Sequence, residues 1–443
     1  LLDGLDWKPY TYRWNDEETD ASLVEAKGDR IPIRVPDAIL GQRTTEHVFA
    51  SRTQCNTCHH VANQGPMTFN AANLWGERDE ELPEWVITSW DELVDRGVVK
   101  SGKAVRPNAK LVNAQDRNES LEARARSYLD INCGACHRRN GGATSSLFLG
   151  RSIAEAKMGA INELPAQGDF GITDARILTP GSPEKSILFY RLATAGPGKM
   201  PKVIGQEPDI EGAKVVWDWI RSMEETKPRA LMTPSEISTT ERALLFWNQL
   251  AETTPEEACR LASSAIKQNR DPAINGLFNR WIEQDQRRVT VGDQPDFDAL
   301  LKLPGSAIEG QRWYAHASTS QCRKCHHVHK QDALIGPSLA GISKRRTRRQ
   351  ILEHIAEPSR EIADQWKTYN VLTIDGLVIA GLKESEAEES LMLKSSDGRV
   401  HRIEKDDIES IRIAEQSLMP SGLISAMTPQ EVADMLAYLA ALP

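Results

Sequence analysis

The sequence of 443 residues lacks features that define several common classes of protein. It contains no apolar run approaching the roughly 20 residues that a membrane-spanning helix needs. It also has no excess of basic residues, since its formal net charge is −9, whereas a surface that binds nucleic acid is usually basic. We therefore expect no membrane span in this chain and no nucleic acid as a partner.

The first residues, Leu1-Leu2-Asp3, include neither an initiator methionine nor the basic and apolar regions of a signal peptide. We therefore expect a processed product or an excised fragment of a longer protein.

Cysteine is scarce, but six of the seven cysteines fall into three copies of the pattern Cys-x-x-Cys-His. This pattern is the attachment sequence of c-type haem, in which the two thiols bond to the two vinyl groups of one porphyrin. The histidine that follows is then held under the iron as the proximal ligand. The sequence predicts three covalently bound haem c groups, attached through Cys55, Cys58 and His59, through Cys133, Cys136 and His137, and through Cys322, Cys325 and His326.

Two other kinds of site also use Cys-x-x-Cys, namely a structural zinc site and a dithiol redox site. Zinc does not require a histidine directly after the second cysteine, and three such pairs do not divide into four-ligand sites. A dithiol site begins a helix after a buried strand, whereas Leu121 to Ile131, ahead of the second motif, has the apolar pattern of an amphipathic helix. Haem attachment is the favoured interpretation, and metal or dithiol chemistry is the alternative.

The second and third motifs are each followed by a Met-Pro pair in a loop, at Met200 and Met419. Helix, attachment motif, loop, Met-Pro and helix is the order found in class I cytochromes c, so we expect these methionines to be the distal ligands of haems 2 and 3. For haem 1 the candidate in the sequence is His47, eight residues before Cys55; Met67 is disfavoured because it would lie on the proximal face. The alternatives at haem 1 are an open site, a water, or a ligand from another part of the assembly.

A Gly-Pro pair follows the first and third motifs, at Gly65-Pro66 and Gly336-Pro337. In class I cytochromes c the carbonyl of a proline in this loop accepts the Nδ1 proton of the proximal histidine, which fixes the orientation of the ring. We expect the same contact for His59 and His326.

The segments outside the motifs have their own patterns. Near the N-terminus, aromatic and β-branched residues such as Tyr12 and Trp14 alternate with polar ones, which predicts short strands with the aromatic side chains in the core. Residues 229–300 have helical periods and no metal motif, which predicts a helical spacer. After the third motif, Asp375-Gly376 and Asp397-Gly398 are hairpin signals between strand-like runs, which predicts an inserted β-subdomain.

The sequence as a whole therefore predicts a mainly α fold of three cytochrome c-like haem modules, with a short N-terminal β region and a small β-subdomain in the third module. The expected parts are residues 1–110 with the first haem module, 111–228 with the second module, 229–300 as the helical spacer, and 301–443 with the third module.

Two further features have a structural and a functional interpretation. Cys259, the cysteine outside the motifs, lies in a predicted helix, and we expect a buried, inert thiol. The basic run from Lys344 to Arg349 is typical of a solvated helix start. The alternative is a patch that steers an acidic redox partner, because such patches raise association rates at low salt.

The C-terminal region resembles a known family. The residues that carry the resemblance are Cys322 to His327, Gly336 to Ile342, Ile355 to Ser359, Ser417 to Pro420 and Asp434 to Leu439. They are similar to the haem-binding C-x-x-C-H domain that is common in planctomycetes and verrucomicrobia, and they span the module from about residue 303 to the end. The resemblance implies haem c at this motif.

Residues 11–224 are similar to a second family, the dihaem c-type cytochromes. The matching residues are Tyr12 to Asp16, Ser51 to Cys55, Arg124 to Cys133, Pro180 to Pro183 and Lys199 to Pro201. Such regions often follow a β-propeller sugar dehydrogenase that uses pyrroloquinoline quinone. The resemblance implies a role as electron acceptor for that oxidation, with the dehydrogenase as redox partner.

The leading functional hypothesis is an extracytoplasmic triheme c-type cytochrome that carries electrons from a dehydrogenase to a downstream acceptor. Because bacteria attach haem to this motif outside the cytoplasm, we expect an exported, periplasmic protein. One alternative is a multihaem peroxidase-like enzyme with haem 1 as an open catalytic site, which needs a five-coordinate iron and nearby acid or base groups. A structural or carbohydrate-docking module, suggested by the β elements alone, is a third possibility.

Overall fold

The structure is a computed structural model. It describes residues 2–3, 6–7, 9–52, 54–55, 90–98, 110–138, 143, 145, 147–201, 207–225, 231–292, 295–315, 322–328, 335–374, 378–396, 398–414 and 417–443.

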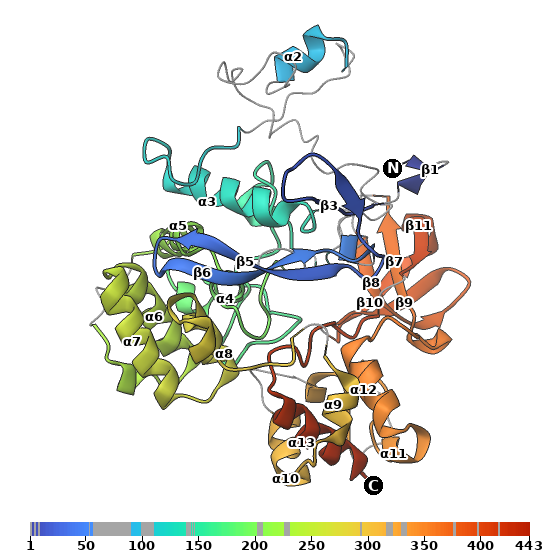
Figure 1. Ribbon diagram of the computed structural model, residues 1–443. Coiled ribbons are helices and arrows are strands. Elements are labelled where there is room, and N and C mark those ends of the chain that lie inside the picture. Colours follow the sequence, from blue (N-terminus) through green and yellow to red (C-terminus); the bar gives the residue numbers. More distant parts are fainter. Residues whose placement is uncertain are drawn as a thin grey trace.

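The described residues form a mixed α and β protein. Helices account for 40% of these residues and strands for 17%. The prediction of a mainly α fold made of three cytochrome c-like modules is therefore wrong. The strands form a five-stranded antiparallel sheet in the C-terminal third and a long hairpin near the N-terminus, so they are main parts of the architecture and not short additions (Figure 1).

The strands and helices follow the chain in three stretches. The N-terminal strands are β1 (Leu2–Asp3), β2 (Asp6–Trp7), β3 (Tyr12–Trp14), β4 (Ala21–Leu23), β5 (Asp29–Asp37) and β6 (Gly41–Phe49). The middle helices are α2 (Trp90–Asp95), α3 (Leu121–Leu129), α4 (Ile187–Ala193), α5 (Ile210–Ser222), α6 (Thr240–Ala251), α7 (Pro255–Gln268) and α8 (Pro272–Phe278). The C-terminal elements are α9 (Phe297–Lys302), α10 (Ala307–Ala315), α11 (Ile342–Arg345), α12 (Arg348–Ala356), β7 (Thr368–Thr373), β8 (Val378–Glu386), β9 (Ser390–Lys394), β10 (Val400–Glu404), β11 (Ile408–Ile413) and α13 (Pro429–Ala440).

One hydrophobic core is shared by the helices from α3 to α8. At its centre Phe189 packs edge-to-face against Trp217, with ring centroids 4.8 Å apart, and against Trp247 at 5.0 Å. Trp247 in turn contacts Trp281 at 5.9 Å. The segment that was predicted as a spacer supplies Trp247 and Trp281, so it completes the core around the second motif.

A second hydrophobic core lies between α9, α10, α12 and α13 at the C-terminal end of the chain (Figure 1). Capping boxes begin two of these helices: Thr347 pairs with Gln350 at α12, and Thr428 pairs with Glu431 at α13. Each box satisfies backbone N–H groups that have no partner within the helix.

The five-stranded sheet is inserted between α12 and α13, and its strand order is β10-β9-β8-β7-β11. Neighbouring strands pair antiparallel, and the small core of the sheet contains Val371, Leu391, Leu393 and Ile403. The strands lie where the hairpin signals predict them.

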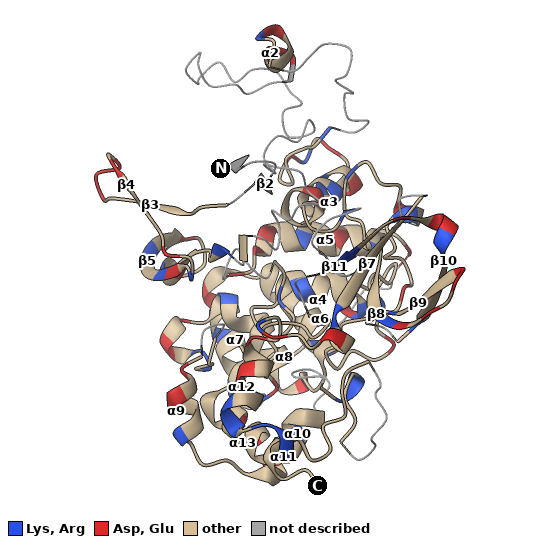
Figure 2. Ribbon diagram, turned by 90° about the vertical axis from the view of Figure 1, so that its right-hand side faces the viewer, with Lys and Arg blue, Asp and Glu red and all other residues tan. Residues whose placement is uncertain are grey.

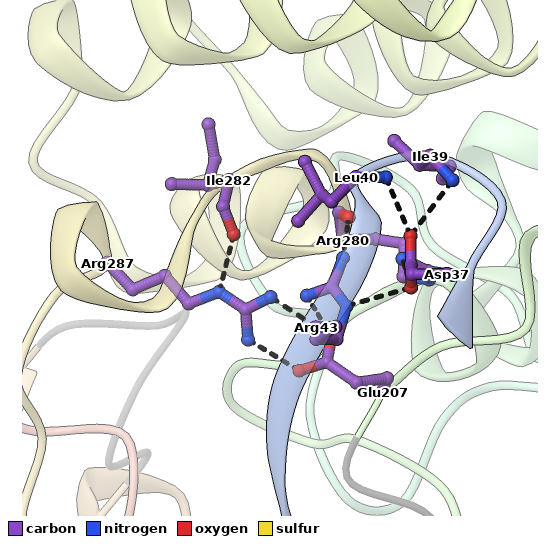
Figure 3. Close-up of polar contacts among 8 residues, drawn as sticks. All are labelled: Asp37, Ile39, Leu40, Arg43, Glu207, Arg280, Ile282 and Arg287. Atoms are coloured by element: carbon purple, nitrogen blue, oxygen red, sulfur yellow. Dashed lines mark hydrogen bonds and ion pairs between the residues drawn. The ribbon is translucent and has the colours of Figure 1, made fainter. Parts of the chain in front are cut away.

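The β5–β6 hairpin is fixed to the helical core by a buried network of charged side chains (Figure 3). Asp37, at the hairpin turn, accepts from Arg43 Nε at 3.0 Å and pairs with Arg280 at 2.7 Å. Arg43 also pairs with Glu207 at 3.4 Å, and Glu207 pairs with Arg287 at 2.5 Å. The network ties the hairpin, and with it the chain that leads to Cys55, to segments near residues 207 and 280.

The pKa values within this network reflect its burial. Burial alone raises the pKa of Asp37, but the backbone N–H groups of Leu40 and Ile39 and the guanidinium groups of Arg43 and Arg280 bring it down to about 2. Burial raises the pKa of Glu207, in spite of Arg43 and Arg280 nearby. Of the two carboxyl groups, Asp37 is therefore the one whose ionised form the fold stabilises.

The aromatic residues of β3 are not in the core. Tyr12 is 51% exposed and Trp14 is 62% exposed. The prediction that this aromatic stripe is buried is wrong, because β3 pairs only with the three residues of β4 in a two-stranded sheet that no described layer covers.

None of the helices in the described part of the chain is long and apolar enough to cross a membrane. This agrees with the sequence, which lacks a long apolar run.

Candidate functional site

The second attachment motif follows directly from α3. Ser120 caps the helix by accepting from the N–H of Ala123, and the helix continues beyond Leu129 as a π-helical turn, Asp130–Gly134. Single π turns inside helices are frequent at functional sites. This turn delivers Cys133 at the end of the helix.

The motif itself forms a tight backbone turn. The carbonyl of Cys133 accepts from the N–H of Cys136 at 3.1 Å and from the N–H of His137 at 2.9 Å. The carbonyl of Cys136 accepts from Ala143 at 3.2 Å, and that of His137 accepts from Leu149 at 2.8 Å. The loop after the motif is thereby folded back onto it.

The third motif has the same turn. The carbonyl of Cys322 accepts from Cys325 at 3.2 Å and from His326 at 2.9 Å, and that of Cys325 accepts from Gly336 at 2.9 Å. The two segments, 189 residues apart, thus fold the same five-residue pattern in the same way. In both, one turn places two cysteines and a histidine close together.

The proline contact predicted for the third motif is confirmed. His326 Nδ1 lies 2.7 Å from the carbonyl oxygen of Pro337. A carbonyl only accepts, so Nδ1 carries the proton and Nε2 keeps its lone pair. Burial lowers the pKa of His326, and the hydrogen bond to Pro337 raises it by a smaller amount. The net shift is downward, so the neutral ring is favoured. A neutral imidazole with its second nitrogen anchored is the form that binds a metal.

Two neighbours fix the position of His326. A Cβ atom on Gly336 would lie 2.6 Å from His326 Cε1, so only glycine lets the backbone approach the ring this closely. From α10, the hydroxyl of Tyr314 donates to the carbonyl of His326 at 2.7 Å. The ring is therefore held from the loop side and its backbone from the helix side.

In each of these two motifs, burial disfavours ionisation of one cysteine thiol. Burial raises the pKa of Cys133 to about 12, helped by the charge of Asp130, and burial also raises the pKa of Cys325. Neither of these two cysteines is in a disulfide. Reactive dithiol sites have the opposite character, a lowered pKa, so the structure weighs against the dithiol alternative at these two motifs.

Zinc gains no support either. Among the residues that the structure describes, no group of three or more His, Cys, Asp or Glu side chains is placed to hold a metal ion. A structural zinc site needs four such ligands. A bound haem needs only the axial histidine and one further ligand from the protein. The lack of a three-ligand group among the described residues therefore says nothing about haem binding.

Met200 lies in a loop that is held firmly to α4. Its N–H donates to the carbonyl of Arg191 at 2.9 Å. The guanidinium of Arg191 donates to the carbonyl of Gly198 at 2.9 Å, and the hydroxyl of Tyr190 donates to that of Pro197 at 2.9 Å. Gly198 has φ +79°, and a Cβ there would collide with the ring of Phe170. The half-buried Met200 is thus presented by a preorganised loop, and its role as ligand stays a prediction.

Met419 lies in the C-terminal region. Its N–H donates to Ser417 Oγ at 3.1 Å, and the N–H of Ser417 donates to Ser359 Oγ at 3.0 Å. Met419 and Cys322, far apart in sequence, both pack against the core between α9, α10, α12 and α13. The structure brings this methionine to the region of the third motif, and its role as ligand also stays a prediction.

Most of the first motif lies outside the described residues, including Cys58 and His59, and so do Pro66 and Met67 after it. Cys55 is described: its N–H donates to the carbonyl of Ser51 at 2.9 Å, and its sulfur lies 3.9 Å from Thr11 Oγ1. His47 is exposed on β6, opposite Ile31, and its ring meets Phe49 edge-on at 4.7 Å. Its assignment to haem 1 stays a prediction.

The helices that flank each described motif cross at very close range. On α5, a Cβ at Gly212 would collide with the ring of Tyr128 on α3. On α10, a Cβ at Gly310 would collide with the carbonyl of Asp434 on α13. In each case the helix before the motif packs directly on the helix after the methionine loop, which fixes the two ends of the segment between them.

Other predicted features have structural roles. Cys259 is half-buried against the helical core, and burial raises the pKa of its thiol. In the basic run, Arg345 donates to the carbonyls of Ala340 and Ser338, Arg348 donates to those of Leu301 and Leu303, and Arg349 pairs with Asp298. These contacts hold loops together near α11 and α12, where Figure 2 shows Lys and Arg in blue.

Sequence reasoning missed several residues that shape the site. Tyr314 was assigned only to a helix, and Arg191 and Asp169 were not singled out. A tyrosine eight residues ahead of the first cysteine of a motif is a signal that could have pointed to a partner of the motif backbone. Asp169 has no local signal, because its partner, Lys324 at 2.9 Å, is 155 residues away.

A hollow beside the charged network is lined by Arg34, Gln42, Arg43, Thr44 and residues 283–286. It contains none of the predicted haem-binding residues, so it has no bearing on those sites.

Neither the known protein families nor the curated proteins include a match to this chain.

Proposed function

We propose that the chain is an extracytoplasmic c-type cytochrome that carries three covalently bound haem groups and transfers electrons between partner proteins. The observation that supports this most strongly is the third motif. There the turn from Cys322 to His326 is combined with a proximal histidine whose Nδ1 is anchored on Pro337. This arrangement suits a metal-bound imidazole, as the proposed haem attachment requires.

The residues at each motif have distinct tasks in this proposal. When bound, each haem accepts and releases one electron at its iron, and methionine ligation raises the reduction potential. Cys322 and Cys325 would hold the group covalently, and His326, anchored through Pro337, would supply a nitrogen ligand to the iron. Met419 would complete the ligand set, leaving no position for a substrate, which favours electron transfer over catalysis.

The partners are proposed from the resemblance to the dihaem cytochromes. The proposed donor is a dehydrogenase domain or partner of the quinoprotein type that oxidises sugars. An exported location follows from the attachment chemistry, since bacteria join haem to this motif outside the cytoplasm.

The test removes one attachment site at a time. In a host with c-type maturation, the double variants C133S/C136S and C322S/C325S should each contain one haem fewer than the wild type. Cys259→Ser is the matched control, because it removes the cysteine outside the motifs and should leave the haem content unchanged. Equal haem content in all four proteins, or no haem in any of them, would refute the proposal.

A further inference from the structure

An ion pair joins the segments that carry the second and third sites. Lys324, between the two cysteines of the third motif, donates from Nζ to Asp169 Oδ2 at 2.9 Å. Both side chains are about one third exposed. The contact bridges 155 residues of sequence.

Asp169 lies on a loop that is built into the helical core. The next residue, Phe170, is 3% exposed, stacks on Tyr190 with ring centroids 4.6 Å apart, and accepts at its carbonyl from Thr240 Oγ1 at 2.8 Å. Phe170 has φ +51°, a left-handed conformation that is unusual for a bulky residue and persists only where the surroundings enforce it. Asp169 is thus presented from a fixed position.

The same loop also contacts the segment that presents Met200. The ring of Phe170 fills the space where Gly198 lacks a side chain. The guanidinium of Arg191 lies 4.9 Å from the centre of the Phe170 ring and donates to the carbonyl of Gly198 and to that of Gln167, each at 2.9 Å. A continuous series of contacts therefore runs from the Met200 loop through Phe170 and Asp169 to Lys324.

We infer that Lys324 and Asp169 are positioning residues, which hold the third attachment motif against the Met200 side of the second site so that the two sites form one unit. This rests on the proposed function for its redox meaning. In that function the second and third sites would be held in fixed positions relative to each other, and the first site would be attached separately through the β5–β6 hairpin. The geometry itself depends only on residues of this chain.

The first test needs no haem. A carbodiimide joins a carboxylate to an amine only where the two touch, so mass spectrometry of the treated full-length protein should find a peptide pair that contains Asp169 and Lys324. The pair should be lost in Asp169→Asn and in Lys324→Gln, which keeps the Cys-x-x-Cys-His pattern. It should persist in Glu163→Gln, an exposed control in the same region. Absence of the pair in the wild type would overturn the inference.

The second test reverses the charge. Asp169→Lys places two cations together, and we expect amide exchange in residues 322–328 and 196–201 to accelerate by about three- to tenfold, as fits an exposed pair replaced by a repulsion. The reciprocal double variant D169K/K324E should restore the wild-type rates, whereas Glu163→Lys should leave them unchanged. Asp169 Oδ1 also accepts from the N–H of Gly171 at 3.1 Å. Asp169→Asn keeps an oxygen that can accept this bond, so it removes the charge without removing the local hydrogen bond. Unchanged exchange in D169K, or acceleration that the double variant fails to reverse, would refute a positioning role.

The third test separates this inference from the proposed function. In the haem-loaded protein, Asp169→Lys should shift the midpoint potential of the centre at His326 to more positive values, since added positive charge favours the reduced state, and Glu163→Lys should shift it much less. If the protein binds no haem but the cross-link and exchange results hold, the contact stands and the proposed function fails. If three haems bind and the charge at residue 169 alters neither exchange nor potential, the inference fails while the function stands.

Discussion

The second and third Cys-x-x-Cys-His motifs share a backbone turn and differ in what surrounds it. The second follows a π-helical turn and sits beside a large core to which α3 to α8 all contribute. The third is half-buried like the second, but it lies on a smaller core and is positioned by the Tyr314 hydroxyl, the Pro337 carbonyl and the ion pair to Asp169. The same pentapeptide can thus be held by bulk packing or by a few polar contacts.

This difference suggests separate roles. The cysteines and histidine of both motifs are half-buried, but the residues between the cysteines differ: Arg323 and Lys324 are exposed cations in the third motif, whereas Gly134 and Ala135 carry no charge in the second. In the proposed function, the third site is therefore the more suitable one for meeting a redox partner, and the second is the more suitable one for an internal position.

The largest expected effect tests the shared core of the second region. Trp247→Ala should lower the free energy of unfolding by about 3–5 kcal/mol, as for other buried tryptophans, and should weaken α3 as well as α6. Chemical denaturation followed by amide exchange in residues 121–129 measures this. Trp14→Ala, at a residue that is 62% exposed, is the control and should cost less than about 0.5 kcal/mol. If exchange accelerated only in residues 240–281 and not in residues 121–129, these two segments would have separate cores.

The corresponding test for the third region uses the close crossing of α10 and α13. Gly310→Ala introduces a Cβ against the backbone of Asp434 and should destabilise the region by about 3 kcal/mol, near the top of the range for overpacking. Gly150→Ala is the matched control, because its Cβ would meet only Ile153 at 3.6 Å. Thermal melts of the two variants give the comparison, and equal melting temperatures would show that the crossing is looser than described.

A pH titration tests how the first region is attached to the second. The pKa of Asp37 is about 2, below its usual value near 3.9 in an unfolded chain. A group whose pKa is lower when folded stabilises the fold above its unfolded pKa and loses that effect as the pH falls through the folded value. Asp37 should therefore contribute about 2 kcal/mol that is lost between pH 4 and pH 2.

The measurement for Asp37 is the unfolding free energy of wild type and Asp37→Asn across that pH range. The difference between the two proteins should be largest near pH 5 and should shrink as the pH approaches 2. Asp29→Asn, whose carboxylate is 52% exposed, serves as control. A difference that does not vary with pH would contradict the assigned role.

The smallest expected effect concerns a polar contact at the third motif. Tyr314→Phe removes the hydrogen bond to the carbonyl of His326 and should cost about 1 kcal/mol. Tyr438→Phe is a matched control on the neighbouring ring, whose centroid is 5.4 Å away, and should be close to neutral. Urea denaturation is precise enough to separate the two, and an equal cost would argue that the Tyr314 hydroxyl does not hold the motif.

Local patterns predicted the elements well. The Asp375-Gly376 pair lies between β7 and β8, and the Asp397-Gly398 pair lies between β9 and β10, as the hairpin signals predict. The Pro337 contact with His326 was also predicted, because the Gly-Pro pair carries a local signal. These features depend on residues that are close in the sequence.

Long-range features were missed or mistaken. The fold class was wrong because the size of the sheets follows from pairing between strands and not from the strand patterns themselves. Helical periodicity in residues 229–300 showed an apolar face but not that this face packs against Phe189 and Trp217. No local pattern predicts that Tyr12 and Trp14 are exposed or that Asp169 contacts Lys324. Both features depend on how segments far apart in the sequence are placed.

The most direct test of the account is the intact mass of the pure protein, expressed with c-type maturation machinery. The account predicts a coloured protein that is heavier than the 49.3 kDa polypeptide by three haem groups that survive denaturation. A colourless protein with the mass of the bare polypeptide would contradict it.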